Sequence, residues 1–152
     1  MGVLVIILGV LIWYTVKTYN TVKPLQISVS ESESNIGILL QKRESIINKL
    51  NEIANSYTKY EKDIIERLSD DMKSNKDSML TINRLYDAYP DLKLNQTFSE
   101  LVDRLYTIES ERQQTIEYYN SRVRYYNEAV TSFPAILICL MISFKEKTFF
   151  NN

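Results

Sequence analysis

Residues 96–133 carry the most regular pattern in the chain and read QTFSELVDRLYTIESERQQTIEYYNSRVRYYNEAVTSF. Apolar side chains recur there at alternating steps of four and three residues, which is the spacing of a helix that packs along another helix. The predicted seam comprises Phe98, Val102, Leu105, Glu109, Arg112, Ile116, Tyr119, Val123, Tyr126, Val130 and Phe133. At 1.5 Å per residue, this coiled-coil-like helix would be about 55 Å long. Asn95 is its predicted N-cap, and Pro134 closes it.

Two charged residues, Glu109 and Arg112, interrupt this apolar seam. They are three residues apart, so they can pair with each other on one face of the helix. A pair inside a seam usually fixes the register of packing more than it stabilises the fold. A small rotation of the helix is the alternative, because it would leave the pair in water. The seam would then comprise Leu101, Leu105, Ile108 and Thr115.

A second amphipathic pattern lies earlier in the chain. Its apolar positions predict one long helix and comprise Ile36, Leu40, Ile47, Leu50, Ala54, Tyr57, Ile64 and Leu68. Polar residues 69–78 predict a turn, and residues 79–89 predict a short helix that Pro90 ends. Pro24 is expected to end or kink whatever helix precedes this pattern. We therefore predict an all-α fold, an elongated antiparallel bundle of three to four helices, two of them long, after an N-terminal transmembrane helix.

The chain opens with an uncharged apolar run, residues 1–16, which begins with Met1 and ends with Val16. About 20 residues cross a hydrocarbon core of ~30 Å and ~17 is the lower limit, so the run is short but usable. Trp13 and Tyr14 stand where an interfacial aromatic belt would lie. The run therefore predicts a signal-anchor helix that contacts membrane lipid.

Three alternatives to an anchor fit the run less well. A cleavable signal peptide would need a basic start and a small-residue cleavage site, and a myristoylation signal would need Ser or Thr where Ile6 stands. A buried core helix would show charge on one face. We expect a transmembrane anchor at 1–18 and a helical bundle at 19–152. Lys17 and Lys23 follow the run, so the positive-inside rule predicts a short N-terminus outside and the body in the cytoplasm.

The composition excludes several functional classes. The 152 residues include no histidine, and Cys139 is the single cysteine, which rules out His-based triads and paired-cysteine metal sites. The 18 basic and 19 acidic residues give a net charge of -1, which argues against a nucleic-acid partner. The acidic residues Asp87, Asp91 and Glu100 are better explained by turn and helix-start chemistry than by acid–base catalysis. We expect no enzyme, no cofactor and no metal site.

Two further features concern the end of the chain. Asn120 and Asn127 are seven residues apart on one flank of the long helix, where their amides can bond across helices or to a partner. Residues 134–144 form a second apolar stretch that is too short to span a membrane. A core helix that closes the bundle is the favoured reading of this stretch, and a re-entrant or interfacial segment is the alternative.

Several motifs follow one another along the second half of the chain: Tyr89-Pro90-Asp91-Leu92-Lys93 with Asn95 and Phe98, Tyr119-Asn120 with Val123, Tyr126-Asn127, and Phe133-Pro134. Together they resemble the LemA family of bacterial membrane-anchored proteins. The resemblance implies an N-terminal transmembrane anchor and a helical bundle, and the family has no established molecular function. We expect a non-enzymatic interaction or scaffolding module of the bacterial cell envelope with an unidentified protein partner. The alternative is a lipid-contacting or membrane-remodelling protein that uses its apolar C-terminal segment.

Overall fold

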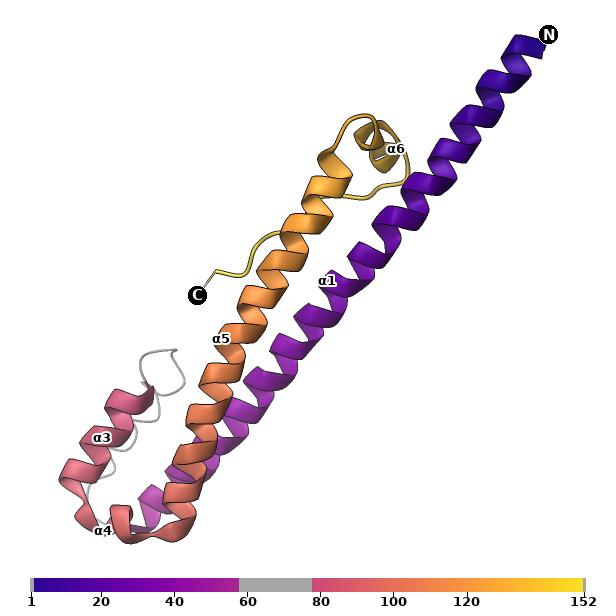
Figure 1. Cartoon of the computed structure of the whole chain (residues 1–152). Coiled ribbons are helices and arrows are strands. Elements are labelled where there is room, and N and C mark those ends of the chain that lie inside the picture. Colours follow the sequence, from indigo (N-terminus) through magenta and orange to yellow (C-terminus); the bar gives the residue numbers. More distant parts are fainter. Residues whose placement is uncertain (1, 58–77, 152) are drawn as a thin grey trace. The chain divides into compact units, whose positions relative to one another are not determined.

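The structure, a computed structural model, describes residues 2–57 and 78–151 (Figure 1). The described residues contain helices and no strand. The helices are α1 (Gly2–Tyr57), α3 (Ser78–Ala88), α4 (Pro90–Leu94), α5 (Gln96–Thr131) and α6 (Ala135–Met141). The predicted all-α class with two long helices is confirmed. The predicted turn at 69–78, except for Ser78, and the predicted helical residues 58–68 lie outside the described residues.

Pro24 does not end a helix, because α1 is continuous from Gly2 to Tyr57 with Pro24 inside it. The expectation that a helix ends at this residue is wrong. Proline removes the N–H that would bond the carbonyl of Asn20, four residues earlier. Both Pro24 and Asn20 lie on the exposed side of α1, so water can satisfy that carbonyl.

The chain divides into two compact units. Unit 1 comprises Met1–Ile36 and Gln114–Asn152. Its core lies between the first part of α1, the second part of α5 and the residues around α6. The buried residues are Val22, Val29, Ile36, Ile116, Tyr119, Val123, Tyr126, Val130, Cys139 and Phe144. The three α1 residues of this set are seven residues apart, so the heptad pattern of α1 begins before the stretch from which it was predicted.

Unit 2 comprises Gly37–Gln113. Its core lies between the second part of α1, the short helices α3 and α4, and the first part of α5 (Figure 1). The buried residues are Ile47, Leu50, Ala54, Ile82, Leu85, Leu92, Phe98, Leu101, Val102 and Leu105. The ring of Tyr86 meets the ring of Phe98 edge-on, with 5.7 Å between the ring centroids. The short helices α3 and α4 thus pack on the apolar face of α5 in this unit and bury it.

The seam predicted for α5 matches the structure from Phe98 to Val130, where each apolar member is buried. Phe133 departs from it and is 83% exposed, because α5 ends at Thr131 and the heptad spacing stops with the helix. Leu101 and Ile108 are also buried, so in unit 2 the apolar face of α5 is wider than one seam. A face of that width is expected where a helix packs against more than one neighbour.

Candidate functional site

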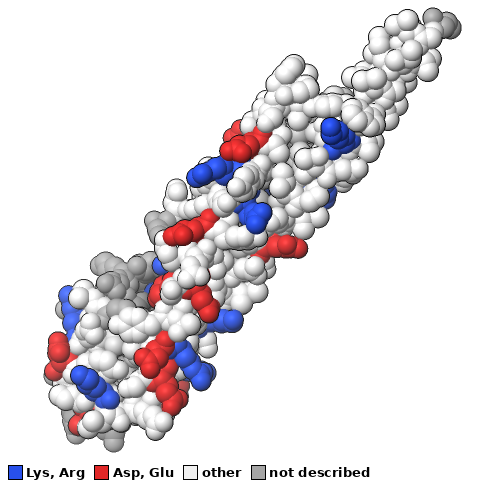
Figure 2. Space-filling model, in the orientation of Figure 1, with Lys and Arg blue, Asp and Glu red and all other residues white. Residues whose placement is uncertain are grey.

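The first turns of α1 expose their apolar side chains to solvent. From Val3 to Trp13, the large hydrophobic residues are between 51% and 71% exposed. The apolar window of α1 has a mean hydropathy of 1.8, and 6% of it is buried. Among the described helices, α1 is the one long and apolar enough to cross a membrane. A core helix of such composition would be mostly buried, so this end of α1 is a candidate membrane anchor; the same end carries no charged side chain in Figure 2.

An aromatic and a basic residue mark the end of this uncharged run. Trp13 is 62% exposed, and the ammonium of Lys17 lies 5.2 Å from the centre of its ring. A cation over an indole face is attracted to the ring's electron density. Trp and Lys are also the residues that anchor a helix at the boundary between lipid and water. The boundary predicted from the sequence therefore coincides with a defined contact.

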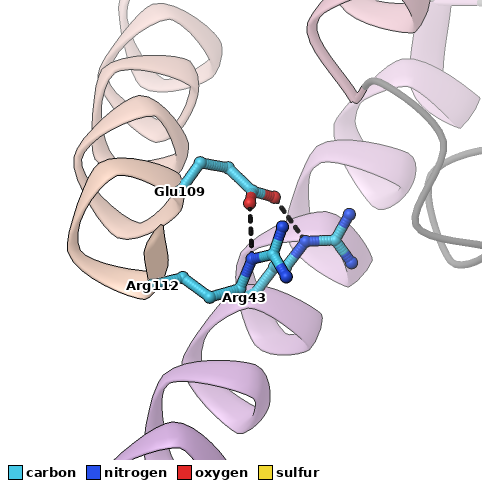
Figure 3. A network of polar contacts seen from close by, with 3 residues as sticks. All are labelled: Arg43, Glu109 and Arg112. Atoms are coloured by element: carbon cyan, nitrogen blue, oxygen red, sulfur yellow. Dashed lines mark hydrogen bonds and ion pairs between the residues drawn. The ribbon is translucent and has the colours of Figure 1, made fainter. Parts of the chain in front are cut away.

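A network of three charged side chains lies in unit 2 and joins α1 to α5 (Figure 3). Glu109 accepts a hydrogen bond from Arg112 Nε over 2.9 Å and another from Arg43 Nε over 2.5 Å. The exposed fraction is 8% for the Arg43 side chain, 24% for Glu109 and 17% for Arg112. The structure thus brings together Glu109 and Arg112, the two residues singled out in the sequence. Their side chains are mostly buried but remain partly accessible to water.

Arg43 is the member of this network that the sequence analysis missed. It lies seven residues after Ile36 and seven before Leu50, so it occupies a seam position of α1. The spacing rule could have found it, but the seam was followed through apolar residues alone, and the charged position between Leu40 and Ile47 was left out. In the structure Leu40 is exposed, whereas Leu39 is buried and takes its place.

The Tyr-Pro-Asp-Leu-Lys motif forms the short helix α4 rather than a simple turn. Pro90 occupies the first helical position, where its missing N–H costs nothing. Leu92 is fully buried in the core of unit 2. Asn95 then caps α5, because its Oδ1 accepts a hydrogen bond of 2.9 Å from Phe98 N–H, which confirms the predicted N-cap. The motif is therefore a corner that turns the chain into α5.

The acidic side chains near this corner do not converge. Asp87, Asp91 and Glu100 are all exposed, and Glu100 accepts a hydrogen bond from the Gln96 amide over 3.1 Å. In the part of the chain that the structure describes, no three His, Cys, Asp or Glu side chains gather as metal ligands would. The corner has the chemistry of a helix start.

Asn120 and Asn127 hold residues 145–151, the extended segment, against α5. Asn127 Nδ2 donates to the carbonyl of Lys147 over 2.8 Å, and its Oδ1 accepts from Lys147 N–H over 2.9 Å. Asn120 makes the same pair of bonds with Phe150: its Nδ2 donates to the carbonyl over 3.2 Å, and its Oδ1 accepts from the N–H over 2.8 Å. Each amide thus satisfies both backbone groups of one residue, as a neighbouring strand would. The sequence predicted that these amides bond across helices or to a partner, whereas in the structure they bond the backbone of an extended segment of the same chain.

The register of these contacts explains the seven-residue spacing of the two asparagines. Seven helical residues rise about 10.5 Å, and three residues of extended chain cover about 10 Å. Lys147 and Phe150 are three residues apart, so their spacing along the extended segment equals that of Asn127 and Asn120 along α5. The later asparagine bonds the earlier residue of the segment, so the segment runs antiparallel to α5. The Phe150 ring also packs edge-on against Tyr119, with 6.4 Å between centroids.

The two tyrosines of the Tyr–Asn pairs have different surroundings. The hydroxyl of Tyr119 donates to the carbonyl of Thr148 over 3.1 Å. The hydroxyl of Tyr126 is buried and has no hydrogen-bond partner among the described residues. Burial raises the pKa of both phenols above the ordinary value of 10.0, with a smaller contribution from Glu33 at Tyr119 and from Cys139 at Tyr126.

An aromatic and basic patch, with two exposed tyrosines and a half-buried arginine, lies on α5 in unit 1. Tyr118, Arg122 and Tyr125 follow one another at steps of four and three residues, so they share one face. The Arg122 guanidinium lies 4.4 Å from the centre of the Tyr118 ring. Tyr118 and Tyr125 remain 48% and 54% exposed. Tyr and Arg are the side chains that dominate binding energy at protein interfaces.

The comparison with known proteins agrees with the motifs. The model of the LemA family matches residues 32–152, which is most of the chain and includes the Tyr-Pro-Asp-Leu-Lys corner and both Tyr–Asn pairs. Neither the curated proteins nor the solved structures provide a match. The match to residues 32–152 shows that the chain belongs to the LemA family.

Proposed function

We propose that this LemA-family chain is a single-pass, membrane-anchored helical protein whose body serves as an interaction or scaffolding module of the cell envelope, without enzymatic activity. The observation that carries the proposal is the continuity of α1. Its first turns are apolar and exposed, and the same helix then supplies core residues to both compact units. A helix that leaves a membrane and then packs into the core of unit 1 holds that unit at the membrane surface.

The absence of histidine and of paired cysteines supports a role in binding rather than catalysis. A solvent-open hollow of about 400 Å³ in unit 2 is lined by residues that include Lys42, Arg104 and Glu111. Catalytic pockets are usually enclosed and mostly apolar, with a few polar groups that converge. This hollow is open to solvent, and its lining mixes charged side chains with the apolar side chains of Ile46 and Ile108.

The patch formed by Tyr118, Arg122 and Tyr125 is the surface on which we place the protein partner. It lies on a regular helix, so its side chains are presented in a fixed geometry. Both tyrosines carry large exposed areas, and the arginine is already ordered by its contact with Tyr118. Ordering an arginine before binding reduces the conformational entropy that association costs.

Photocrosslinking in native membranes tests this proposal. A photoreactive phenylalanine analogue would replace Tyr118 or Tyr125 in the full chain, and the same analogue at exposed Ser34 of α1 is the matched control. We expect an adduct of one discrete mass from the two tyrosine positions and none from position 34. Equal adducts from all three positions, or none from any, would contradict a partner on this patch.

A further inference from the structure

Helix α6 has an apolar face that the fold does not cover. Leu137, Leu140 and Met141 are 58%, 70% and 85% exposed, and Phe133 just before the helix is 83% exposed. Leu140 and Met141 follow Leu137 by three and four residues, so these three side chains lie on one side of α6, whereas Phe133 precedes the helix. Cys139 lies on the other side and is buried in the core of unit 1. The prediction of a core helix therefore describes one face of α6, and the second face remains to be explained.

The location of α6 in unit 1 supplies the explanation. Ala135, at the start of α6, shares a small hollow of about 220 Å³ with Tyr14, Lys17 and Thr18 of α1. Phe144, just after α6, packs against Tyr19, with 5.9 Å between ring centroids. The start of α6 and the residue just after it thus lie close to α1 near the end of its uncharged run, and Figure 1 shows α6 beside this part of α1.

The chemistry of this stretch fits a bilayer surface. Residues 133–144 contain no charged side chain, and Lys145 and Glu146 follow directly. Seven residues of helix are about 10 Å long, so α6 cannot cross a hydrocarbon core of ~30 Å and can only lie along its edge. Helices that lie in the interface bury an apolar face about 5–10 Å into the boundary between headgroups and acyl chains.

We propose that the apolar face of α6 is a second membrane contact, inserted into the headgroup–acyl boundary of the bilayer that α1 crosses. The inference rests on the proposed anchoring of α1 and adds a lipid-binding surface to it. Trp13 and Lys17 mark the interface on α1, and α6 lies beside the residues that follow Trp13. Two contacts at one depth fix the tilt and rotation of unit 1 against the membrane, which a lone helix leaves free.

Fluorescence quenching by brominated phosphatidylcholine tests the proposal with the full chain in lipid vesicles. Trp13 is the single tryptophan, so the unmodified protein reports on the anchor. In a Trp13→Phe background, Met141→Trp or Leu140→Trp reports on α6. Ile27→Trp is the matched control, because Ile27 is exposed on α1 and lies about 16 Å beyond Val16. Circular dichroism checks that each variant retains its helices.

We expect shallow bromines to quench the indoles of Met141→Trp and Leu140→Trp about as strongly as native Trp13, and to leave that of Ile27→Trp unquenched. Adding Leu137→Gln and Leu140→Gln to the Met141→Trp variant should weaken its quenching. If Trp13 is quenched while both α6 indoles emit as in water, the proposal is wrong and the anchor stands.

Two other results would overturn the proposal for different reasons. Blue-shifted α6 indoles that bromines do not quench would mean that a protein surface, from a second copy or another partner, covers α6. Unquenched Trp13 would remove the anchor itself, and with it both the proposed function and the lipid contact. The same lipid series therefore separates failure of the second contact from failure of the first.

Discussion

Asn127 pairs with Lys147 through both ends of its side-chain amide, and these two bonds replace the ones that a β-strand partner would make. The extended segment has no secondary structure of its own, yet its backbone groups at Lys147 and Phe150 are satisfied by side chains of α5. Buried backbone groups without partners are costly, so the two asparagines allow an irregular segment to lie flat on a helix.

Replacing Asn127 with alanine should release this contact. Each lost hydrogen bond contributes about 0.5–1.5 kcal/mol, so Asn127→Ala should lower the free energy of unfolding by roughly 1–3 kcal/mol. Hydrogen exchange at the Lys147 amide should accelerate at the same time, because its acceptor is gone. Urea denaturation and exchange measured by mass spectrometry check the two effects.

Asn35→Ala is the matched control for this experiment, since Asn35 lies on the exposed side of α1 in the same unit. Alanine is the better helix former, so this change should be neutral or slightly stabilising. An unchanged exchange rate at Lys147 in Asn127→Ala would show that the amide does not hold the extended segment.

Glu109 is predicted to be the critical member of the charged network. Glu109→Leu removes the carboxylate that accepts from both Arg43 and Arg112, so it breaks two ion pairs at once, and breaking a buried pair costs up to about 3–5 kcal/mol. Arg112→Leu leaves Glu109 bonded to Arg43, so its cost should be about 1 kcal/mol or less. Urea denaturation of both variants decides the order. Equal losses, or a larger loss for Arg112→Leu, would exclude a network centred on Glu109.

The two buried tyrosines provide a paired test of hydrogen bonding. Tyr119→Phe removes the bond to the Thr148 carbonyl and should cost about 0.5–1.5 kcal/mol. Tyr126→Phe removes a buried hydroxyl that has no partner in the described structure, so it should be neutral or stabilising by up to about 1 kcal/mol. A comparable loss of stability in both variants would mean that the Tyr126 hydroxyl is bonded in solution.

The raised phenol pKa values predict a specific alkaline instability. Unfolded tyrosines ionise near 10.0, whereas burial keeps Tyr119 and Tyr126 neutral to higher pH in the folded chain. Their contribution to stability is therefore complete below about pH 10 and is lost as the pH rises from there through the folded pKa. Denaturation at a series of alkaline pH values measures the decline. Tyr126→Phe should lose less unfolding free energy per pH unit above about pH 10 than the unmodified chain. The same loss in both proteins would show that the Tyr126 phenol does not cause it.

The heptad spacing was sufficient to predict most of the α5 core, because a period near 3.5 residues specifies which face is buried. It failed at Phe133, where the helix had already ended. The helix end expected at Pro24 from proline chemistry was also wrong, because Pro24 and Asn20 are exposed and water can bond the carbonyl that loses its partner. Arg43 was passed over because a charged residue on a seam does not look apolar. The segment that Asn120 and Asn127 bind could not be predicted. An asparagine amide bonds backbone groups, which are alike at nearly every residue, so the sequence does not show which segment it will meet.

The same limit applies to α6. The uncharged composition of residues 134–144 is equally compatible with a core helix and with a lipid contact. Only the positions of Leu140 and Met141 on the uncovered side, and of Cys139 on the covered side, distinguish the two faces. Which face is covered depends on how α6 packs beside α1 and α5, which is a property of the tertiary structure.

Alkaline carbonate extraction of native membranes tests the central claim most directly, because it strips peripheral proteins and leaves spanning ones. The apolar and exposed start of α1 predicts that the full chain stays in the membrane pellet. An arginine at the middle of a span costs roughly 2.5–3.5 kcal/mol, so Ile7→Arg should shift part of the protein to the supernatant. Release of the unmodified chain into the supernatant would contradict membrane anchoring by α1.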